Sequence, residues 1–72
     1  MKVKTRLIAS ASSKEEIKKM IARFFCNKPE NYRIGGTGLV WSNMPDGTEK
    51  WLKSFRVIQK KDRFRFEAII GG

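Results

Sequence analysis

The sequence predicts an α+β domain of two layers, with one helix packed on one face of a mostly antiparallel sheet of three to four strands. Three observations lead to it: a helical apolar stripe follows a capping signal near residue 13, apolar and polar residues alternate over 2–9, 48–60 and 63–70, and only one helix is available. One helix cannot cover both faces of a sheet, so the other face is expected to be open. The expected order is β-α-(β)-β-β-β in a single domain, 1–72.

The first strand is expected over residues 2–9. Strict alternation divides its side chains between two faces. One face receives Val3, Thr5, Leu7 and Ala9, and the other receives Lys2, Lys4, Arg6 and Ile8. We therefore expect the basic side chains of this strand to lie together.

The helix begins at a capping box, in which Ser13 is the N-cap and Glu16 reaches back to it; Ser12 with Glu15 is the alternative one residue earlier. The spacing i, i+3, i+4, i+7 then defines one apolar stripe: Ile17, Met20, Ile21 and Phe24. The helix should end near Asn27, because a proline follows two residues later. A lone cysteine at this end of the helix, Cys26, is read as a buried thiol, with a surface thiol as the alternative.

The remaining strands are expected at 32–34, 39–43, 48–60 and 63–70. The glycine-rich segment 35–38 is read as a turn or bulge, with an anion-binding nest of backbone N–H groups as the alternative. The segment 44–47, Met-Pro-Asp-Gly, is a strong turn signal. A two-residue or four-residue loop then joins the last two strands as a hairpin, and both loops give the same register.

Pairing residue 60 with residue 63 can be tested for consistency along this hairpin. It places Arg56 opposite Glu67 and Val57 opposite Phe66, so an acid faces a base and apolar side chains face each other. A slip of one residue would put the phenylalanines of the last strand opposite basic side chains. The core face is therefore expected to hold Phe55, Val57, Phe64, Phe66, Ala68 and Ile70.

The open face is expected to carry a local excess of positive charge. Its basic residues are Lys2, Lys4, Arg6, Arg56, Lys60, Arg63 and Arg65, with Glu67 as the one acid among them. Like charges on adjacent strands repel, so a sheet that tolerates them is a candidate for anion binding; an ordinary solvated face is the alternative. The basic residues of the helix are partly offset by Glu15 and Glu16 in its first turn.

Two tryptophans bear on the same face. If residue 43 pairs with residue 48, Val40 and Trp51 face inward and Trp41 faces outward beside Lys50. An exposed tryptophan among basic side chains is a stacking platform for an unpaired base. The alternative is that Trp41 belongs to the core and the register differs by one residue.

Composition excludes several function classes. The 72 residues contain 16 Lys and Arg, 7 Asp and Glu and no His, with a formal net charge of +9. Without histidine the commonest general base and metal ligand are missing, so neither an enzyme nor a metal or other cofactor is expected; a small ribonuclease without histidine is the remaining enzymatic alternative. No segment approaches the length of a membrane span, and a single cysteine fits the cytoplasm.

These observations predict a small basic module that binds DNA or RNA, mainly through phosphates. The expected nucleic-acid-binding residues are Lys4, Arg6, Trp41, Arg56, Lys60, Arg63 and Arg65. The alternative is an interaction or regulatory module, of phage or mobile-element type, that docks on an acidic protein or forms a homodimer. Aliphatic residues expected on the same open face favour that alternative: Leu39, Leu52, Ile58 and Ile69.

Overall fold

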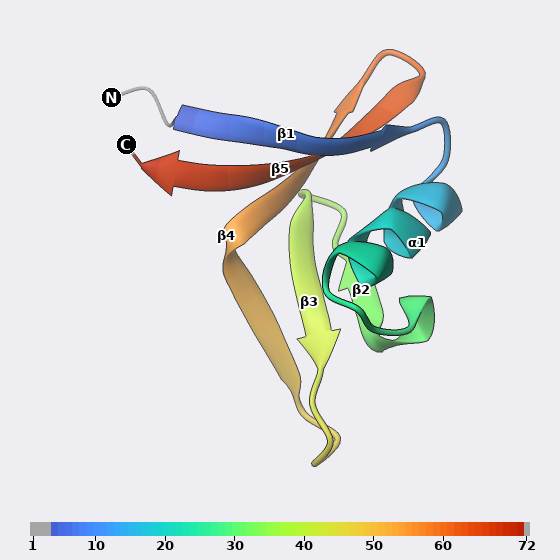
Figure 1. Ribbon diagram of the computed structural model, residues 1–72, viewed down its shortest axis with the longest axis vertical. Helices are drawn as coiled ribbons and strands as arrows, with labels where there is room; N and C mark the ends of the chain where they lie inside the picture. The colour runs from blue at the N-terminus through green and yellow to red at the C-terminus, as the bar shows by residue number, and fades with distance from the viewer. Residues whose placement is uncertain (1–3, 72) are drawn as a thin grey trace.

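The computed structural model describes residues 4–71 and contains one helix packed against a five-stranded antiparallel sheet (Figure 1). The elements are β1 (Lys4–Ala11), α1 (Lys14–Phe24), the short 3-10 helix η1 (Pro29–Asn31), β2 (Tyr32–Ile34), β3 (Leu39–Asn43), β4 (Glu49–Lys60) and β5 (Arg63–Gly71). The strand order is β1-β5-β4-β3-β2. The predicted fold class is confirmed, with five strands in place of three to four because the short β2 pairs fully with β3.

Helix α1 begins as its sequence indicates. The Oγ of Ser13 accepts a hydrogen bond from the backbone N–H of Glu16 at 3.2 Å, which satisfies one of the free N–H groups of the first turn. The apolar stripe is buried in part: Ile17 and Ile21 are both 0% exposed, whereas Met20 and Phe24 are 37% and 50% exposed. The helix ends at Phe24, earlier than the predicted Asn27.

The end of α1 is set by Cys26, which adopts a left-handed conformation with φ 55°. Its N–H donates to the carbonyl of Arg23 at 3.2 Å, and the N–H of Asn27 donates to that of Ala22 at 2.8 Å. This is a Schellman motif, in which glycine usually occupies the left-handed position. The side chain of Cys26 is exposed, so the predicted buried thiol is wrong: the left-handed turn directs it away from the core.

The β4–β5 hairpin has the predicted register. Lys60 pairs with Arg63, Arg56 with Glu67 and Val57 with Phe66. Alternate residues of both strands therefore point toward α1, and the basic residues between them point to the opposite side.

Strand β1 departs from strict alternation. The pairs on β5 are Ala9 with Phe66, Leu7 with Glu67 and Arg6 with Ala68. Ile8 is the extra residue of a β-bulge, and it packs against the core. The bulge reverses the faces beyond it, so Leu7 shares the side of Glu67, whereas Arg6 lies on the helix side with Ala68. The predicted faces of Leu7 and Arg6 are wrong for this reason. Lys2 and Val3 lie outside the described residues.

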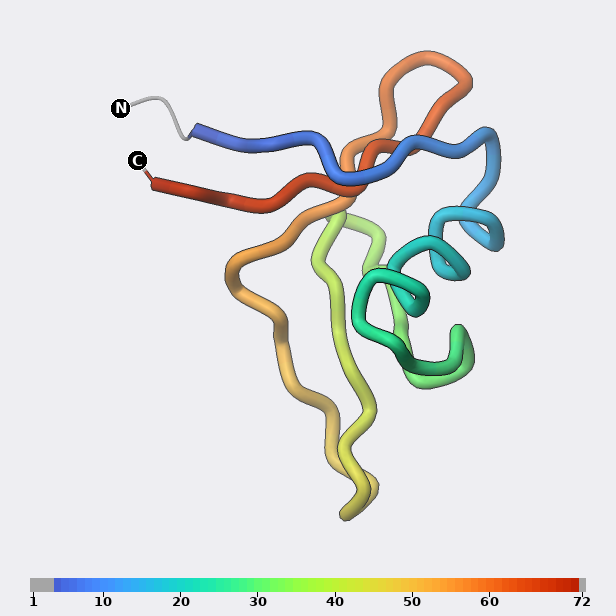
Figure 2. The backbone as a smooth tube through the Cα atoms, in the orientation of Figure 1, coloured from blue at the N-terminus to red at the C-terminus, as the bar shows by residue number. Residues whose placement is uncertain are grey.

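Strand β4 bends sharply in its middle. Leu39 pairs with Arg56 and Trp41 pairs with Trp51, so two residues of β3 span the same distance as five of β4. The last pair between β4 and β5 is Phe55 with Ala68, and the first half of β4 pairs only with β3. Figure 2 shows the trace of β4 turning away from β5 toward the β3–β4 hairpin, while β1 and β5 continue side by side.

The core lies between α1 and the helix-facing side of the sheet. Its fully buried large side chains are Phe66, Ile17, Ile21 and Val40. An aromatic cluster extends it, in which Phe25 stacks on Tyr32 with ring centroids 5.7 Å apart and Phe55 stacks on Phe66 at 5.5 Å. The core thus lies on one side of the sheet, and the opposite side is not covered by the helix.

Replacing Cys26 by glycine should stabilise the protein. A non-glycine residue in the left-handed region costs about 1 kcal/mol, and the exposed thiol contributes little packing in return. We expect Cys26→Gly to raise the free energy of unfolding by up to about 1 kcal/mol in urea titrations. Cys26→Val, whose branched Cβ fits this conformation poorly, should lower it. A Cys26→Gly variant less stable than Cys26→Val would contradict the assignment of the helix end.

Candidate functional site

The face of the sheet opposite α1, here called the outer face, carries a basic cluster. The alternate residues of β4 and β5 on this face are Arg56, Ile58, Lys60, Arg63, Arg65, Glu67 and Ile69. The structure thus brings together four of the predicted binding residues, Arg56, Lys60, Arg63 and Arg65, which we call the basic cluster.

Glu67 organises the centre of this cluster. Its side chain is only 7% exposed, and its two carboxylate oxygens accept hydrogen bonds from two different arginines. The Nε of Arg56 is 3.2 Å from Oε1, and the Nε of Arg65 is 3.1 Å from Oε2. Each arginine side chain remains 37–38% exposed. One acid therefore holds two guanidinium groups of neighbouring strands beside each other.

This triad leaves binding capacity on both arginines. A guanidinium has five N–H donors in a planar fork, and Glu67 engages only the Nε of each. The Nη groups of Arg56 and Arg65 have no hydrogen-bond partner among residues 4–71. Such groups match the oxygens of a phosphate or carboxylate in pairs. With two arginines and one glutamate, the triad keeps a net positive charge.

A shallow groove of about 530 Å³ extends the cluster toward the β4–β5 hairpin. Arg63 lies in it and donates from Nε to the Oγ of Ser10 on β1 at 3.0 Å. Lys60 and Lys61 line the same groove, together with Asp62. Lys61, at φ 55° in the hairpin loop, is a basic residue that alternation of the strands did not predict here.

Lys4 and Arg6 do not join the basic cluster. Arg6 lies beyond the β1 bulge, opposite Ala68, and lines a separate hollow with Phe24 and Ile70 on the helix side. Lys4 pairs with Gly71 at the far end of β5, about 26 Å of extended chain from Arg63. Arg6 was misplaced because the prediction assumed an unbroken strand, whereas Lys4 lies outside the cluster because of its distance along β5.

The β3–β4 hairpin pairs its two tryptophans with each other. Trp41 faces outward, as the register that pairs residue 43 with residue 48 predicted. Its partner on β4, however, is Trp51 and not Lys50. The predicted register is wrong by one residue because Thr48 belongs to the turn. The carboxylate of Asp46 accepts hydrogen bonds from the N–H and Oγ of Thr48, at 3.0 and 2.6 Å. These bonds also lower the pKa of Asp46. The sequence carries a signal for this longer turn, because an aspartate side chain often accepts a hydrogen bond from the backbone two residues later.

The predicted inward position of Trp51 is therefore wrong, because the structure pairs it with Trp41 on the outer face. Trp51 is 42% exposed, whereas Trp41 is half-buried. The centroids of the two rings are 6.5 Å apart. Arg33 lies over Trp41, with its Cζ 5.2 Å from the ring centroid, and donates two hydrogen bonds to Glu49 at 2.8 and 3.0 Å. These hydrogen bonds lower the pKa of Glu49 and raise that of Arg33. Arg33 covers part of Trp41, which leaves Trp51 as the more accessible ring.

The bend of β4 brings the tryptophan pair close to the basic cluster. Leu39 is opposite Arg56, and Trp41 is two residues further along β3 on the same face. Two residues of a strand span about 7 Å. The outer face thus combines arginines with free donors and, one short step away, an exposed indole.

Removing the charge of Glu67 should destabilise the protein. In Glu67→Gln the negative charge is lost and one of the two acceptor oxygens becomes an NH2 donor, so one arginine loses its acceptor and the two arginines repel each other. We expect a loss of about 1–2 kcal/mol in the free energy of unfolding, allowing for the partial solvent exposure of both arginines. The matched control is Glu30→Gln, an exposed carboxylate in η1, which should leave stability unchanged. Equal stabilities of the two variants in thermal or urea unfolding would contradict the organising role of Glu67.

Three other observations bear on function. No helix of residues 4–71 is long and apolar enough to cross a membrane. Within the same residues, no group of three or more His, Cys, Asp or Glu side chains is placed to hold a metal ion. Comparison with protein-family models, with curated proteins and with solved structures finds no match to this chain. The geometry of the outer face is therefore the basis for the functional assignment below.

Proposed function

We propose that this protein binds nucleic acid through its outer face, with the basic cluster contacting phosphate oxygens. The observation that carries the proposal is the Arg56–Glu67–Arg65 triad, in which one buried carboxylate holds two guanidinium groups whose Nη donors have no partner among the described residues. Lys60 and Arg63 add two further cations on the same face. A net charge of +9 favours a polyanion as the partner over a neutral surface.

The tryptophan pair supports nucleic acid over an acidic protein, and an unpaired strand over a duplex. A base can stack on the ring of Trp51 only when it is not already stacked inside a double helix. Lys53, an exposed lysine two residues after Trp51 on β4, adds a further phosphate partner near it. The proposed ligand is therefore a single-stranded segment that follows the outer face from the basic cluster to Trp51.

A protein-interaction role is the second candidate, and two observations favour it. β1 is an edge strand of eight residues, whose outer edge is open to pairing with another strand. Ile70, on the adjacent strand, is 64% exposed. Leu52, which was expected on the open face, packs against the core instead and does not support this role. Light scattering at two protein concentrations separates the candidates: a tight dimer that hides the outer face would count against nucleic-acid binding.

Charge reversal on the outer face should abolish binding, whereas reversal on the helix should not. We expect Arg63→Glu with Arg65→Glu to remove detectable binding of a fluorescent oligonucleotide, because both residues contact phosphates. The matched control is Lys18→Glu with Lys19→Glu on α1, which makes the same change of charge elsewhere. For the native chain, four phosphate contacts predict a slope of about −3 to −4 for log affinity against log salt. A flat salt dependence, or equal losses in both double variants, would refute the proposal.

Removing the exposed indole should weaken binding of single strands and not of duplexes. Trp51→Ala deletes a stacking surface worth about 1–3 kcal/mol per base, which corresponds to a loss of roughly 5- to 150-fold in affinity. The control is Met44→Ala, an exposed apolar residue in the turn of the same hairpin. Tryptophan fluorescence during titration gives an independent readout. Equal affinity for a single strand and its duplex, with no effect of Trp51→Ala, would leave phosphate binding but exclude base stacking.

A further inference from the structure

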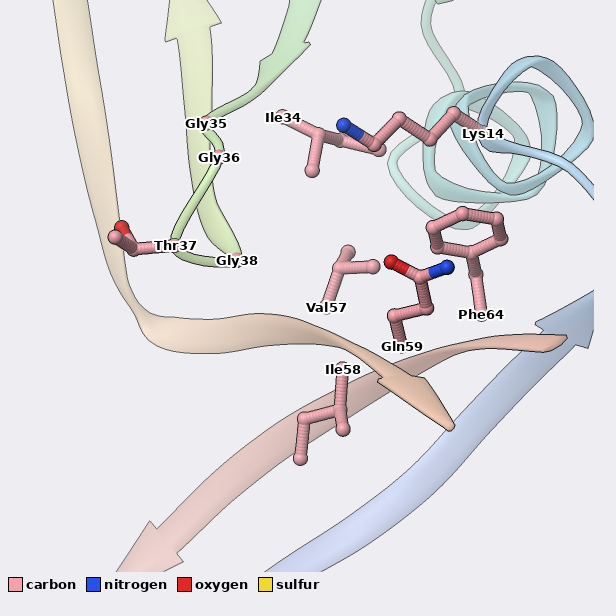
Figure 3. Close-up of a pocket in the computed structure, with 10 residues that line it drawn as sticks. All are labelled: Lys14, Ile34, Gly35, Gly36, Thr37, Gly38, Val57, Ile58, Gln59 and Phe64. Carbon is pink, nitrogen blue, oxygen red and sulfur yellow. The ribbon is translucent and has the colours of Figure 1, made fainter. Parts of the chain in front are cut away.

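The helix side of the sheet contains a second hollow, separate from the outer face. It has a volume of about 250 Å³ and lies between the glycine turn 35–38 and the start of α1 (Figure 3). Its apolar walls are Ile34, Val57 and the ring of Phe64. In Figure 3 the amino group of Lys14 and the amide of Gln59 both extend toward this space, while Ile58 points away from it.

The hollow exists because β3 begins only at Leu39, opposite Arg56, whereas β4 continues to Lys60. The carbonyl of Gly38 accepts a hydrogen bond from the N–H of Val57 at 2.9 Å, where the glycine turn meets β4. A Cβ on Gly38 would lie 2.2 Å from the carbonyl oxygen of Val57, and its φ is +91°, so only glycine fits. Among residues 4–71 no strand pairs with this edge of β4 after Val57, although β4 extends to Lys60.

Gln59 therefore offers its backbone as well as its side chain. In a strand the N–H and C=O groups of alternate residues point to the same side. Since the N–H of Val57 points toward the glycine turn, the N–H and C=O of Gln59 point to that side too, past the end of β3. No hydrogen bond joins them to the turn among the described residues. An adjacent donor and acceptor of this kind match the hydrogen-bonding edge of a planar heterocycle.

The charge and size of the hollow narrow the ligand further. Lys14 supplies one positive charge at its rim, and the ring of Phe64 offers a flat apolar surface. The volume lies just below the range of about 300–1,000 Å³ that is typical of small-molecule sites. It therefore suits a single ring system that carries an anionic group, and not a peptide or a duplex.

We propose that this hollow binds one nucleotide, with the base packed on Phe64, its polar edge on Gln59 and its phosphate on Lys14. The site is independent of the proposed outer-face function, because none of the basic cluster lines it. It would let the protein take a mononucleotide, or a terminal nucleotide, on the side of the sheet opposite the basic cluster.

The test is a titration of isotope-labelled protein with adenosine 5′-monophosphate (AMP), followed by NMR. We expect shifts concentrated at the N–H groups of Gly36 and Gly38 and at the side-chain amide of Gln59. Adenosine should shift the same signals more weakly, and inorganic phosphate should leave the Gln59 amide unmoved. Shifts that map instead to Arg56 and Arg63, or identical shifts with phosphate alone, would overturn the proposal.

Variants separate this site from the outer face. Lys14→Ala should weaken the binding of AMP roughly fivefold or more, because it removes the phosphate contact. The affinity for adenosine, which has no phosphate, should be unchanged. Gln59→Leu should weaken the binding of both AMP and adenosine. The matched control is Lys18→Ala, a lysine one turn further along α1, which should change neither. Loss of AMP binding in Arg63→Glu with Arg65→Glu, and not in Lys14→Ala, would assign the nucleotide to the outer face and overturn the proposal.

Discussion

The outer face depends on one interaction, the carboxylate of Glu67 held between Arg56 and Arg65. Basic side chains on adjacent strands repel each other, and four of them occupy this face of β4 and β5. Glu67 reduces that repulsion at the centre of the cluster, since its two oxygens accept from one arginine each. The arginines are also oriented by it, because a guanidinium held at Nε keeps its remaining donors in a fixed plane. Charge can therefore gather here without preventing the strands from pairing.

The bulge in β1 contributes to the same arrangement. It places Leu7 directly opposite Glu67, so an aliphatic side chain flanks the carboxylate on the strand next to β5. This position helps to explain how an acid that faces away from the helix is only 7% exposed. A carboxylate shielded from water interacts more strongly with its arginines. The irregularity that moves Arg6 to the helix side thus also places Leu7 opposite Glu67, and the basic cluster is smaller than strict alternation predicted.

The parts of the fold that the sequence predicted are those set by local pairs. The register of β4 and β5 follows from a short loop and from Arg56 facing Glu67, both visible along the chain. The β1 bulge could not be predicted in this way, because β1 and β5 are distant in sequence and Ile8 is displaced by packing against the core. The predicted position of Trp51 is wrong for a more local reason. Hydrogen bonds to Asp46 place Thr48 in the turn, which shifts the register by one residue.

The bend of β4 links the two halves of the outer face. In a regular strand the five-residue step from Trp51 to Arg56 would separate them by about 17 Å. In this sheet the same step is matched by only two residues of β3, about 7 Å. The bend costs β4 its pairing with β5 before Phe55, and Leu52 compensates in part by packing on the core. Bulges and bends of this kind redirect side chains. Here the bend brings an exposed indole next to the arginines, so that a phosphate and a neighbouring base of one strand can be bound together.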